Sequence, residues 1–349
     1  MMAKDNNSDA TGGAAAGSRA TLKTIAQLTG LSLSTVSLSL RGGATLKQET
    51  NRRVAEAAQK LGYVPDRAGV RLRTGKTNVI ALVLDGAEES IDFARHMIQG
   101  IGHALHGSRY HLTVTPEFKG NASVETIRYI LENRTADGVI ITHTMLKDER
   151  VQMLIDAGFP FVTHGRTASP TPHAFHDFHA EAFVALAVER LAALGRRDIA
   201  LVIGDDTTTN HHNIVTAFAQ STARLGVRGS ELHSVAGKGA AAIRALGLHM
   251  ATAAEADRPT GIICNSEMRT IALVGGLQDG GLRLGSDIDL VYKQTSDILP
   301  TLFPRLDSIS EDVFAAGVEL TRLLLARIGG AAPETLQTLS EPVANWRSS

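Results

Sequence analysis

Apolar residues recur at helical spacing near the start of the chain and predict a first helix there. Thr21 is suited to cap its start, because a threonine side chain accepts a hydrogen bond from the first backbone amides of a helix. Gly30 is suited to end it, since glycine adopts the left-handed conformation that follows many helices. The apolar positions of this segment are Leu22, Ile25, Ala26 and Leu28.

Two further helices are predicted after this turn. Ser32 and Ser34 are suited to cap a short second helix in which Val36 and Leu40 face inward. A helix, a glycine turn and a second helix form the arrangement that presents the second helix to the major groove of DNA, and a plain three-helix bundle is the alternative. A third helix ends at Gly62, and its predicted buried stripe is Val54, Ala57, Ala58 and Leu61.

From residue 78 onward, short apolar runs rich in β-branched residues alternate with amphipathic helical stretches. This alternation predicts parallel sheets with helices on both faces, and such sheets bind ligands outside the carboxyl ends of their strands. The predicted strands are 79–84, 111–115, 138–142, 161–164, 199–203, 261–264 and 289–292. The predicted helices include 94–106, 124–133, 180–194 and 268–276.

The composition is typical of a globular protein, since 43% of the 349 residues are hydrophobic and 20% are charged. This length predicts two or three folding units. No apolar run approaches the roughly 18 residues of a membrane helix, and residues 1–19 lack the apolar segment of a secretory signal. Cys264 is the single cysteine, which excludes an internal disulfide framework and a cysteine-cluster zinc site. We therefore expect a cytoplasmic protein.

The formal net charge of −1 conceals an uneven distribution. Residues 19–76 hold eleven Lys and Arg against three Asp and Glu, a net charge of +8, whereas residues 77–349 hold 23 against 31, a net charge of −8. All 13 histidines lie in the acidic part. A short basic unit attached to a large acidic body predicts a nucleic-acid partner for the basic end.

Several short motifs follow one another along the basic unit: TLKTIA at 21–26, GLSLSTVS at 30–37, ET at 49–50, LGYVP at 61–65 and RLRTGKTN at 71–78. In this order and spacing they resemble the lactose-repressor (LacI/GalR) family of bacterial transcription factors, and the resemblance covers about residues 20 to 349. It implies an N-terminal all-α helix-turn-helix domain with a hinge helix, joined to a two-lobed α/β periplasmic-binding-protein-like domain with parallel sheets.

The resemblance also implies domain boundaries. We expect a disordered tail at 1–18, the helix-turn-helix domain at 19–64, a hinge helix and linker at 65–76, and an effector-binding and dimerisation domain at 77–349. Within the last, the expected lobes are about 77–178 with 296–312, and about 179–295 with 313–349.

Three residues match the family positions that face base edges: Leu33, Ser34 and Leu38. Leu38 stands where the family usually has arginine, so we expect no bidentate contact to guanine, an apolar contact to a thymine methyl instead, and an atypical operator. Short hydroxyls suited to phosphate contacts belong to Ser32, Thr35, Ser37 and Thr50. Thr21, Arg67 and Arg71 complete the expected DNA-binding set.

Residues 65–72 match the hinge helix of the family, which pairs with its dimer mate over the operator centre. Pro65 suits a helix start, and Leu72 matches the apolar wedge that enters the minor groove and kinks the duplex. Gly69 costs this helix about 0.5–1 kcal/mol relative to alanine. We therefore expect the hinge to fold only on the operator.

The resemblance places an effector cleft between the lobes. Asp92 and Phe93 follow the first strand, Arg166 follows the fourth, and Asp177 lies at the lobe crossover. The remaining expected cleft residues are His143, His212, Asn265, Ser266, Lys293 and Gln294.

Several of these positions depart from the family pattern. Ser266 replaces a common Asp, His212 replaces an arginine that many relatives use, and Lys293 and Gln294 stand near the usual acidic residues. Loss of the acid and gain of a cation favour an anionic or amphoteric effector such as a sugar acid, with a sugar or polyol as the alternative.

Two alternatives from other classes stay open. The first is a His-ligated metalloenzyme, although no HExxH motif is present. The histidines that suggest it are His173, His176 and His179 and the adjacent pair His211 and His212. A sugar-binding protein without DNA function is the second. No nucleophile elbow, Walker loop or dinucleotide fingerprint is present, so we expect neither enzymatic activity nor a cofactor.

Together these features predict a homodimeric repressor of a carbohydrate or sugar-acid catabolic operon. It would bind a pseudo-palindromic double-stranded DNA operator and leave it when a small effector binds. Release by the effector, rather than co-repression, is the expectation that most relatives of this type support.

Overall fold

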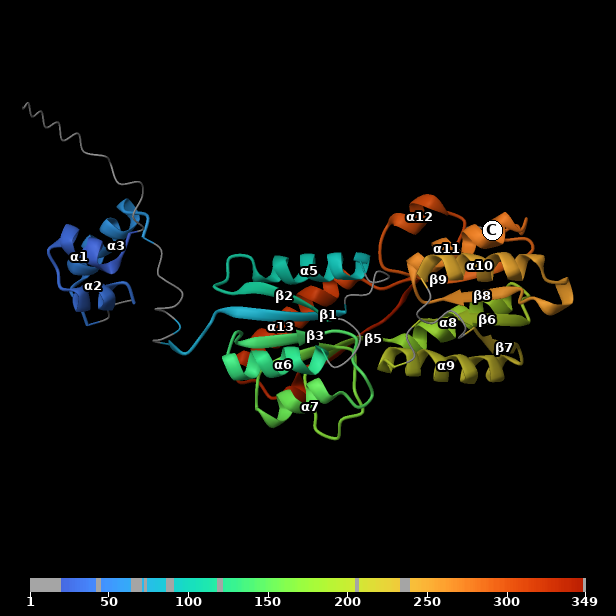
Figure 1. Cartoon of the computed structure of the whole chain (residues 1–349), viewed down its shortest axis with the longest axis horizontal. Coiled ribbons are helices and arrows are strands. Elements are labelled where there is room, and N and C mark those ends of the chain that lie inside the picture. Colours follow the sequence, from blue (N-terminus) through green and yellow to red (C-terminus); the bar gives the residue numbers. More distant parts are fainter. Residues whose placement is uncertain are drawn as a thin grey trace, which may run out of the picture. The chain divides into compact units, whose positions relative to one another are not determined.

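The computed structural model describes residues 20–41, 45–63, 71, 74–85, 91–117, 122–204, 207–232 and 239–347. The chain divides into two compact units, Met1–Lys76 and Thr77–Ser349, and each is described by itself (Figure 1). The expected tail at 1–18 and the hinge residues Pro65, Arg67, Gly69 and Leu72 lie outside the described residues.

The first unit contains the three predicted helices, α1 (Leu22–Thr29), α2 (Leu33–Ser39) and α3 (Gln48–Lys60). Thr21 caps α1 in a reciprocal capping box with Thr24, and Gly30 ends it with a φ of +67°. Ser32 caps α2, because its Oγ accepts a hydrogen bond from the Thr35 amide. These three caps confirm the predicted boundaries of the helix-turn-helix.

A small core holds these helices together, with Leu22, Ala26, Leu31, Leu40 and Tyr63 at its margin. Two core assignments were wrong. Leu28 is 51% exposed, because positions i, i+3, i+4 and i+7 of α1 place Thr29 inward instead. Leu61 is 36% exposed, because it lies at the C-cap of α3 rather than on its stripe. The fully packed residues are Ile25, Val36, Val54, Ala57 and Ala58.

The second unit contains, within the described residues, two sheets of six strands each. The first has the order β11-β5-β4-β3-β1-β2 and the second β12-β10-β9-β8-β6-β7. All pairings are parallel except that of β10 with β12. The first sheet consists of β1 (Val79–Asp85), β2 (His111–Glu117), β3 (Gly138–Ile141), β4 (Phe161–His164), β5 (Phe175–Phe178) and β11 (Gln337–Ser340). The second consists of β6 (Asp198–Val202), β7 (Arg228–Glu231), β8 (Gly261–Cys264), β9 (Asp289–Gln294), β10 (Asp307–Ser310) and β12 (Val343–Asn345).

Helices cover both faces of each sheet, as the alternation predicted. On the first sheet, α5 (Ile91–Leu105) and α13 (Val313–Ile328) cover one face, and α6 (Ala122–Asn133) and α7 (Glu149–Asp156) the other. The residues of β1 alternate accordingly, since Ile80 and Leu82 pack toward α5 and α13 while Ala81 and Val83 pack toward α6 and α7. Both faces of this strand are therefore shielded from solvent, which explains its continuous apolar run.

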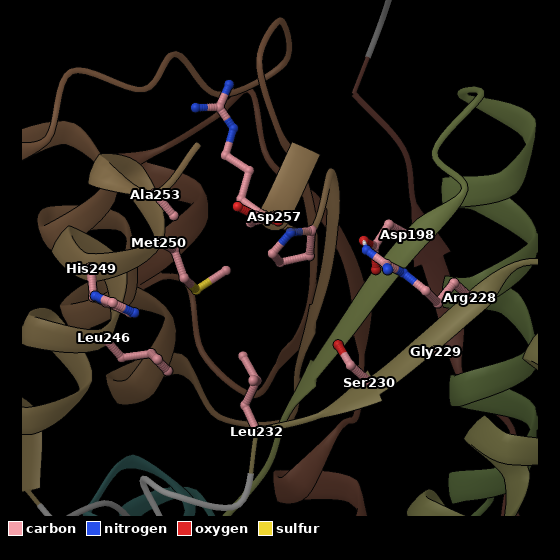
Figure 2. A pocket seen from close by; sticks show the side chains of 12 residues that line it. Asp198, Arg228, Gly229, Ser230, Leu232, Leu246, His249, Met250, Ala253 and Asp257 are labelled. Carbon is pink, nitrogen blue, oxygen red and sulfur yellow. Dashed lines mark hydrogen bonds and ion pairs between the residues drawn. The ribbon is translucent and has the colours of Figure 1, made fainter. Parts of the chain in front are cut away.

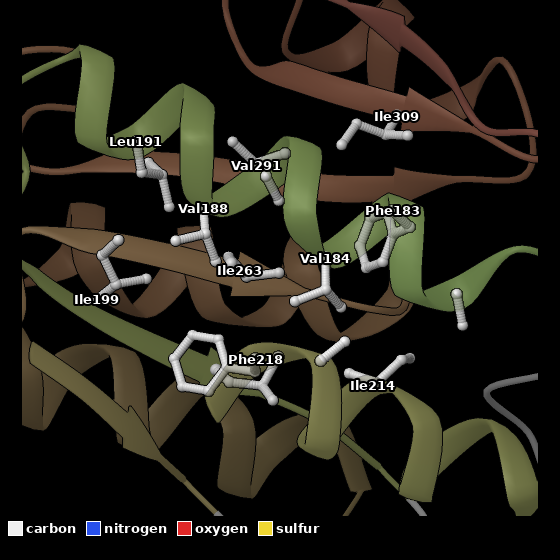
Figure 3. Packing of buried hydrophobic residues seen from close by; sticks show 14 of the residues in the cluster. Phe183, Val184, Val188, Leu191, Ile199, Ile214, Phe218, Ile263, Val291 and Ile309 are labelled. Atoms are coloured by element: carbon white, nitrogen blue, oxygen red, sulfur yellow. The ribbon is translucent and has the colours of Figure 1, made fainter. Parts of the chain in front are cut away.

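The second sheet has α8 (Ala180–Ala193) and α9 (Thr209–Leu225) on one face, with α10 (Gly239–Thr252) and α11 (Glu267–Asp279) on the other. Figure 3 shows the α8 residues Phe183, Val184 and Val188 facing strand residues such as Ile263 and Val291. The short helix α12 (Ile298–Leu302) follows β9. Among the described helices, none combines the length and the apolar character that a membrane span requires.

The predicted division of the body between lobes was wrong for residues 296–340. Residues 296–312 include β10, which pairs with β9 of the second sheet, whereas 313–340 supply α13 and β11 to the first sheet. We call 77–178 with 313–340 the first lobe and 179–312 with 343–347 the second lobe. The strands β5, β7, β10, β11 and β12 were missed because they are short and polar, and pairing rather than local pattern defines them.

Candidate functional site

One side of α2 is turned away from the core of the first unit. Val36 and Ser39 are buried against α1 and α3, whereas Leu33 is 52% exposed. Ser34 is exposed beside it, and Leu38 is half-buried one turn further along the helix. The structure thus places the three expected base-reading residues on the side of α2 away from the core.

Two of the hydroxyls expected to contact phosphates, those of Ser32 and Thr35, take part in local hydrogen bonds. Ser32 Oγ lies 2.8 Å from both Ser34 Oγ and Thr35 Oγ1, in addition to capping α2. Thr21 is occupied by its capping box, and Thr50 is half-buried in the first turn of α3. The Thr21 and Ser32 hydroxyls thus stabilise the starts of α1 and α2 in the free protein.

Among the described residues of this unit, the basic side chains are exposed around the helices. Arg53 also joins two of them, because its guanidinium donates to the Thr29 carbonyl at 2.8 Å, at the carboxyl end of α1. Arg71 is exposed, and Ser37 accepts a hydrogen bond from Arg41 through its backbone carbonyl at 2.7 Å. Arg67 and Leu72 lie outside the described residues.

In the second unit, Phe93 brings two histidines together near the carboxyl ends of β3 and β4. Its ring meets His143 edge-on at a centroid distance of 5.6 Å and His164 at 5.2 Å. His143 has a φ of +54°, a backbone conformation that non-glycine residues rarely adopt. Asp92 is not part of this group, since it pairs along α5 with Arg95 at 3.4 Å.

Arg166 and Asp177, both expected in the effector cleft, are hydrogen-bonded to each other. Arg166 Nε donates to Asp177 Oδ2 at 2.6 Å, and its terminal nitrogen lies 2.9 Å from both carboxylate oxygens of Glu181. The guanidinium therefore faces two carboxylates of the chain itself, and its positive charge is compensated before any ligand binds.

Lys293 also has a partner within the protein. Its ammonium forms an ion pair with Glu311 and lies 4.7 Å above the centroid of the Phe178 ring. Glu311 Oε1 in turn lies 3.2 Å from His164 Nε2. Burial acts to raise the pKa of the Glu311 carboxyl, but Lys293 and His164 outweigh it and hold this pKa well below its usual range. Sequence reasoning missed Glu311 and His164, because nothing local marks either one.

The remaining expected residues lie in the second lobe. Ser266 caps α11, Gln294 accepts a hydrogen bond from Ser308 at 2.8 Å, and His212 is exposed on α9. Asn265, directly after β8, has a buried Oδ1 with no hydrogen-bond partner among the described residues.

Thr209 is a further polar residue that sequence reasoning missed. It begins α9, its backbone amide donates to the Thr144 carbonyl of the first lobe at 2.8 Å, and its buried Oγ1 has no hydrogen-bond partner among the described residues. Asn265 and Thr209 follow the neighbouring strands β8 and β6, so both buried oxygens belong to the carboxyl edge of the second sheet. Such oxygens suit the hydroxyls of a polar ligand.

The histidine run does not form a metal site. His173 Nε2 lies 2.9 Å from Thr167 Oγ1, His176 Nδ1 lies 2.9 Å from Thr338 Oγ1, and His179 Nδ1 pairs with Glu341 at 2.9 Å. Across the described ranges, no group of three or more His, Cys, Asp or Glu side chains is arranged to hold a metal ion.

A pocket of about 380 Å³ in the second lobe lies along β7 and beside the amino-terminal end of β6 (Figure 2). Leu232 and Met250 point into it, and the Asp198–Arg228 ion pair stands at one side. None of the expected effector residues lines this pocket, so it is separate from the junction of the lobes.

Comparison with known proteins assigns both units. Residues 21–66 match the family described as bacterial regulatory proteins, lacI family, and residues 188–349 match a periplasmic binding protein-like domain. The HTH-type transcriptional regulator RafR of Escherichia coli is 30% identical over 339 residues, which cover 92% of this chain and 96% of RafR.

Solved structures show the same fold. The lac repressor dimer bound to operator and the anti-inducer ONPF matches with a TM-score of 0.80 at 20% identity, over 95% of this chain and 98% of that chain. A complex of the transcriptional regulator CelR with cellobiose matches with a TM-score of 0.67 at 24% identity, over 95% of this chain and 100% of that chain.

Proposed function

We propose, since the chain belongs to the lacI family of bacterial regulatory proteins, that it is a dimeric, ligand-responsive repressor that binds operator DNA through α2. The observation that carries this function is the capped helix-turn-helix, whose α2 keeps Leu33 and Ser34 outside the core within a unit of net charge +8. Such a unit is attracted to the phosphate backbone and presents a helix that fits the major groove. We assign the chain no catalytic step and place it in the cytoplasm, with the DNA.

Two such units in a dimer would read the two halves of a pseudo-palindrome. Leu33, Ser34 and Leu38 are the proposed base-reading residues. Leu38 has no hydrogen-bond donor, so thymine, with its exposed methyl group, is the base we expect opposite it. Arg67, Arg71 and Leu72 complete the proposed interface at the operator centre.

For the effector, the paired charges support an uncharged sugar over a sugar acid. Lys293 faces Glu311, and Arg166 faces Asp177 and Glu181, so neither cation is left for a ligand carboxylate. The cellobiose bound by CelR is also uncharged. The proposed sugar contacts are Phe93, His143, Thr209 and Asn265, with His212, Ser266 and Gln294 at the margin.

A thermal-shift titration of the full chain with cellobiose, other uncharged oligosaccharides and sugar acids of equal size tests the effector class. We expect saturable stabilisation by at least one uncharged sugar and none by the acids. Operator binding is tested by selecting duplexes from a random DNA pool and then adding the stabilising sugar, which should release them. Selection of no preferred sequence would contradict the DNA-binding function, and stabilisation by the acids alone would contradict the effector class.

A further inference from the structure

Glu311 lies on the segment that leads from β10 of the second lobe to α13 of the first, and its carboxylate touches a side chain of each lobe. We propose that Glu311 is a positioning residue: through Lys293 in the second lobe and His164 in the first, it fixes the orientation of one lobe on the other. The regulatory meaning of this contact rests on the proposed function, but the contact itself does not.

Glu311 bridges the lobes, because each of its carboxylate oxygens contacts a side chain of a different lobe. Lys293 belongs to β9 and pairs with one carboxylate oxygen, while His164 ends β4 and lies 3.2 Å from the other. The backbone of Glu311 is fixed to the second lobe as well, since its amide donates to the Gln294 carbonyl at 2.9 Å. A rotation of the first lobe would therefore move His164 away from a carboxylate that cannot follow it.

Because the bridge is buried, it favours one arrangement of the two lobes. The Glu311 side chain is 1% exposed, that of Lys293 13% and that of His164 12%. Removing an ion from water is costly, and only close, well-aligned partners compensate for it. An arrangement of the lobes that separates the partners would leave a buried charge without compensation, so it is disfavoured unless water enters or another group replaces the partner.

The aromatic surroundings of the bridge come from the first lobe. Phe178 lies under the Lys293 ammonium, the Phe93 ring meets His164 edge-on, and the His176 ring lies 6.3 Å from that of His164. These rings and the second histidine carry no compensating negative charge. Glu311 is therefore the carboxylate on which both Lys293 and His164 depend within this cluster.

The bridge also accounts for a departure in the sequence. Lys293 stands near the acidic residues that the family resemblance predicts, and its acidic partner here is Glu311, directly after the next strand of the sheet. The cation is thus used to hold the lobes rather than to hold a ligand. An effector that reorients the lobes would have to act against this bridge, which makes Glu311 a determinant of the response.

The distance between the lobes can be measured without DNA or sugar. We would attach nitroxide labels to cysteines at Tyr129→Cys on α6 and Thr216→Cys on α9, two exposed positions in different lobes of the full chain. Mixing the labelled chain with an excess of unlabelled chain restricts the recorded distance distribution to label pairs within one protomer. Cys264 is buried in β8 and stays unlabelled. We expect one narrow distribution for the otherwise unchanged protein and a broadened or displaced one for Glu311→Gln.

A rescue variant and a matched control separate positioning from loss of stability. Lys293→Gln with Glu311→Gln replaces the ion pair by two uncharged amides, and should restore the narrow distribution. Asp307→Asn breaks a comparably buried ion pair, that of Asp307 with Arg190 at 2.8 Å, within the second lobe alone, and should lower the Tm without changing the distance.

Should Glu311→Gln fail to fold, Glu311→Asp keeps the charge, withdraws it by one methylene and should broaden the distribution as well. An unchanged distribution in either folded variant, or equal broadening in Asp307→Asn, would overturn the proposal. Because no operator or sugar is present, this result is independent of whether the proposed function holds.

Discussion

The Nε atom of Arg166 donates a hydrogen bond to Asp177 Oδ2 at 2.6 Å, so two side chains expected to bind an effector bind each other. Glu181 adds a second carboxylate on the other side of the same guanidinium. Asp177 is buried, and Arg166 is about one-third exposed. The pair therefore helps to hold the segment after β4 against α8, so its removal should affect the stability of the fold.

Replacement of Arg166 by methionine should therefore act first on stability. The change leaves Asp177 buried without its main partner, which should lower the free energy of unfolding by about 1–3 kcal/mol. Urea unfolding at neutral pH measures this loss. The variant Arg166→Lys, which keeps the charge but not the two-sided geometry, should recover part of it. If Arg166→Met unfolds at the same urea concentration as the unchanged protein, the pair is not structural.

Two substitutions of Ser32 separate its role as a cap from a contact to phosphate. Ser32→Ala removes the cap of α2 and should destabilise the first unit by about 1 kcal/mol. Ser32→Asp keeps the cap but adds a negative charge, so it should preserve stability and weaken DNA binding. Thermal unfolding and binding to a selected duplex measure the two effects. Equal DNA affinity in the Asp variant would place Ser32 away from the phosphates.

Introducing arginine at Leu38 should change the base preference at one position of each half-site, toward guanine. A bidentate arginine–guanine contact provides about 1–3 kcal/mol of discrimination against other bases. Sequence selection from random duplexes measures the preference for both proteins. Leu28→Arg adds the same charge at an exposed position of α1 and should raise affinity without changing the preferred base. An unchanged preference in Leu38→Arg would show that this residue does not face the bases.

The charge of the first unit predicts a steep dependence of DNA binding on salt. Each phosphate that the protein neutralises contributes about −0.9 to the slope of log K against log salt concentration. Titration by fluorescence anisotropy from low to physiological salt gives the slope. Deletion of residues 1–76 should abolish the binding and leave a folded second unit, since the two units are compact by themselves. A flat slope for the full chain would argue against phosphate contacts.

We expect the protein to lose stability on acidification because of His176. Burial, with a smaller contribution from His164, lowers the pKa of His176 to about 4, against about 6.5 in an unfolded chain. Between these values the unfolded state binds a proton that the folded state does not, so stability is complete above about pH 6.5 and falls as the pH drops toward 4.

Replacing His176 by glutamine should make stability less dependent on pH. The difference in the free energy of unfolding between pH 7 and pH 4.5 should shrink by up to about 2 kcal/mol. Urea unfolding at both pH values provides the comparison. The same replacement at His106, which is exposed, serves as the control and should leave the difference unchanged. An identical pH dependence in His176→Gln would place the sensitivity elsewhere.

Most helices and the inner strands could be predicted because their own residues define them. The continuous apolar runs at 80–84 and 261–264 are buried on both faces, and Thr21, Gly30 and Ser32 mark helix ends by local chemistry. The polar strands β7, β10 and β11 carry no such pattern. They become strands because a neighbouring strand satisfies their backbone groups, which is a property of the assembled sheet.

The sequence by itself determined the family, the order of the helix-turn-helix and the α/β body, and the concentration of positive charge in residues 19–76. Each of these depends on residues close together in the chain or on simple counting. Tertiary structure alone decided which lobe receives 296–340, and that Lys293 and Arg166 face carboxylates rather than solvent. The physical reason is that Glu311 reaches Lys293 and His164 only when three strands from two sheets converge, and the charge available to a ligand depends on such contacts.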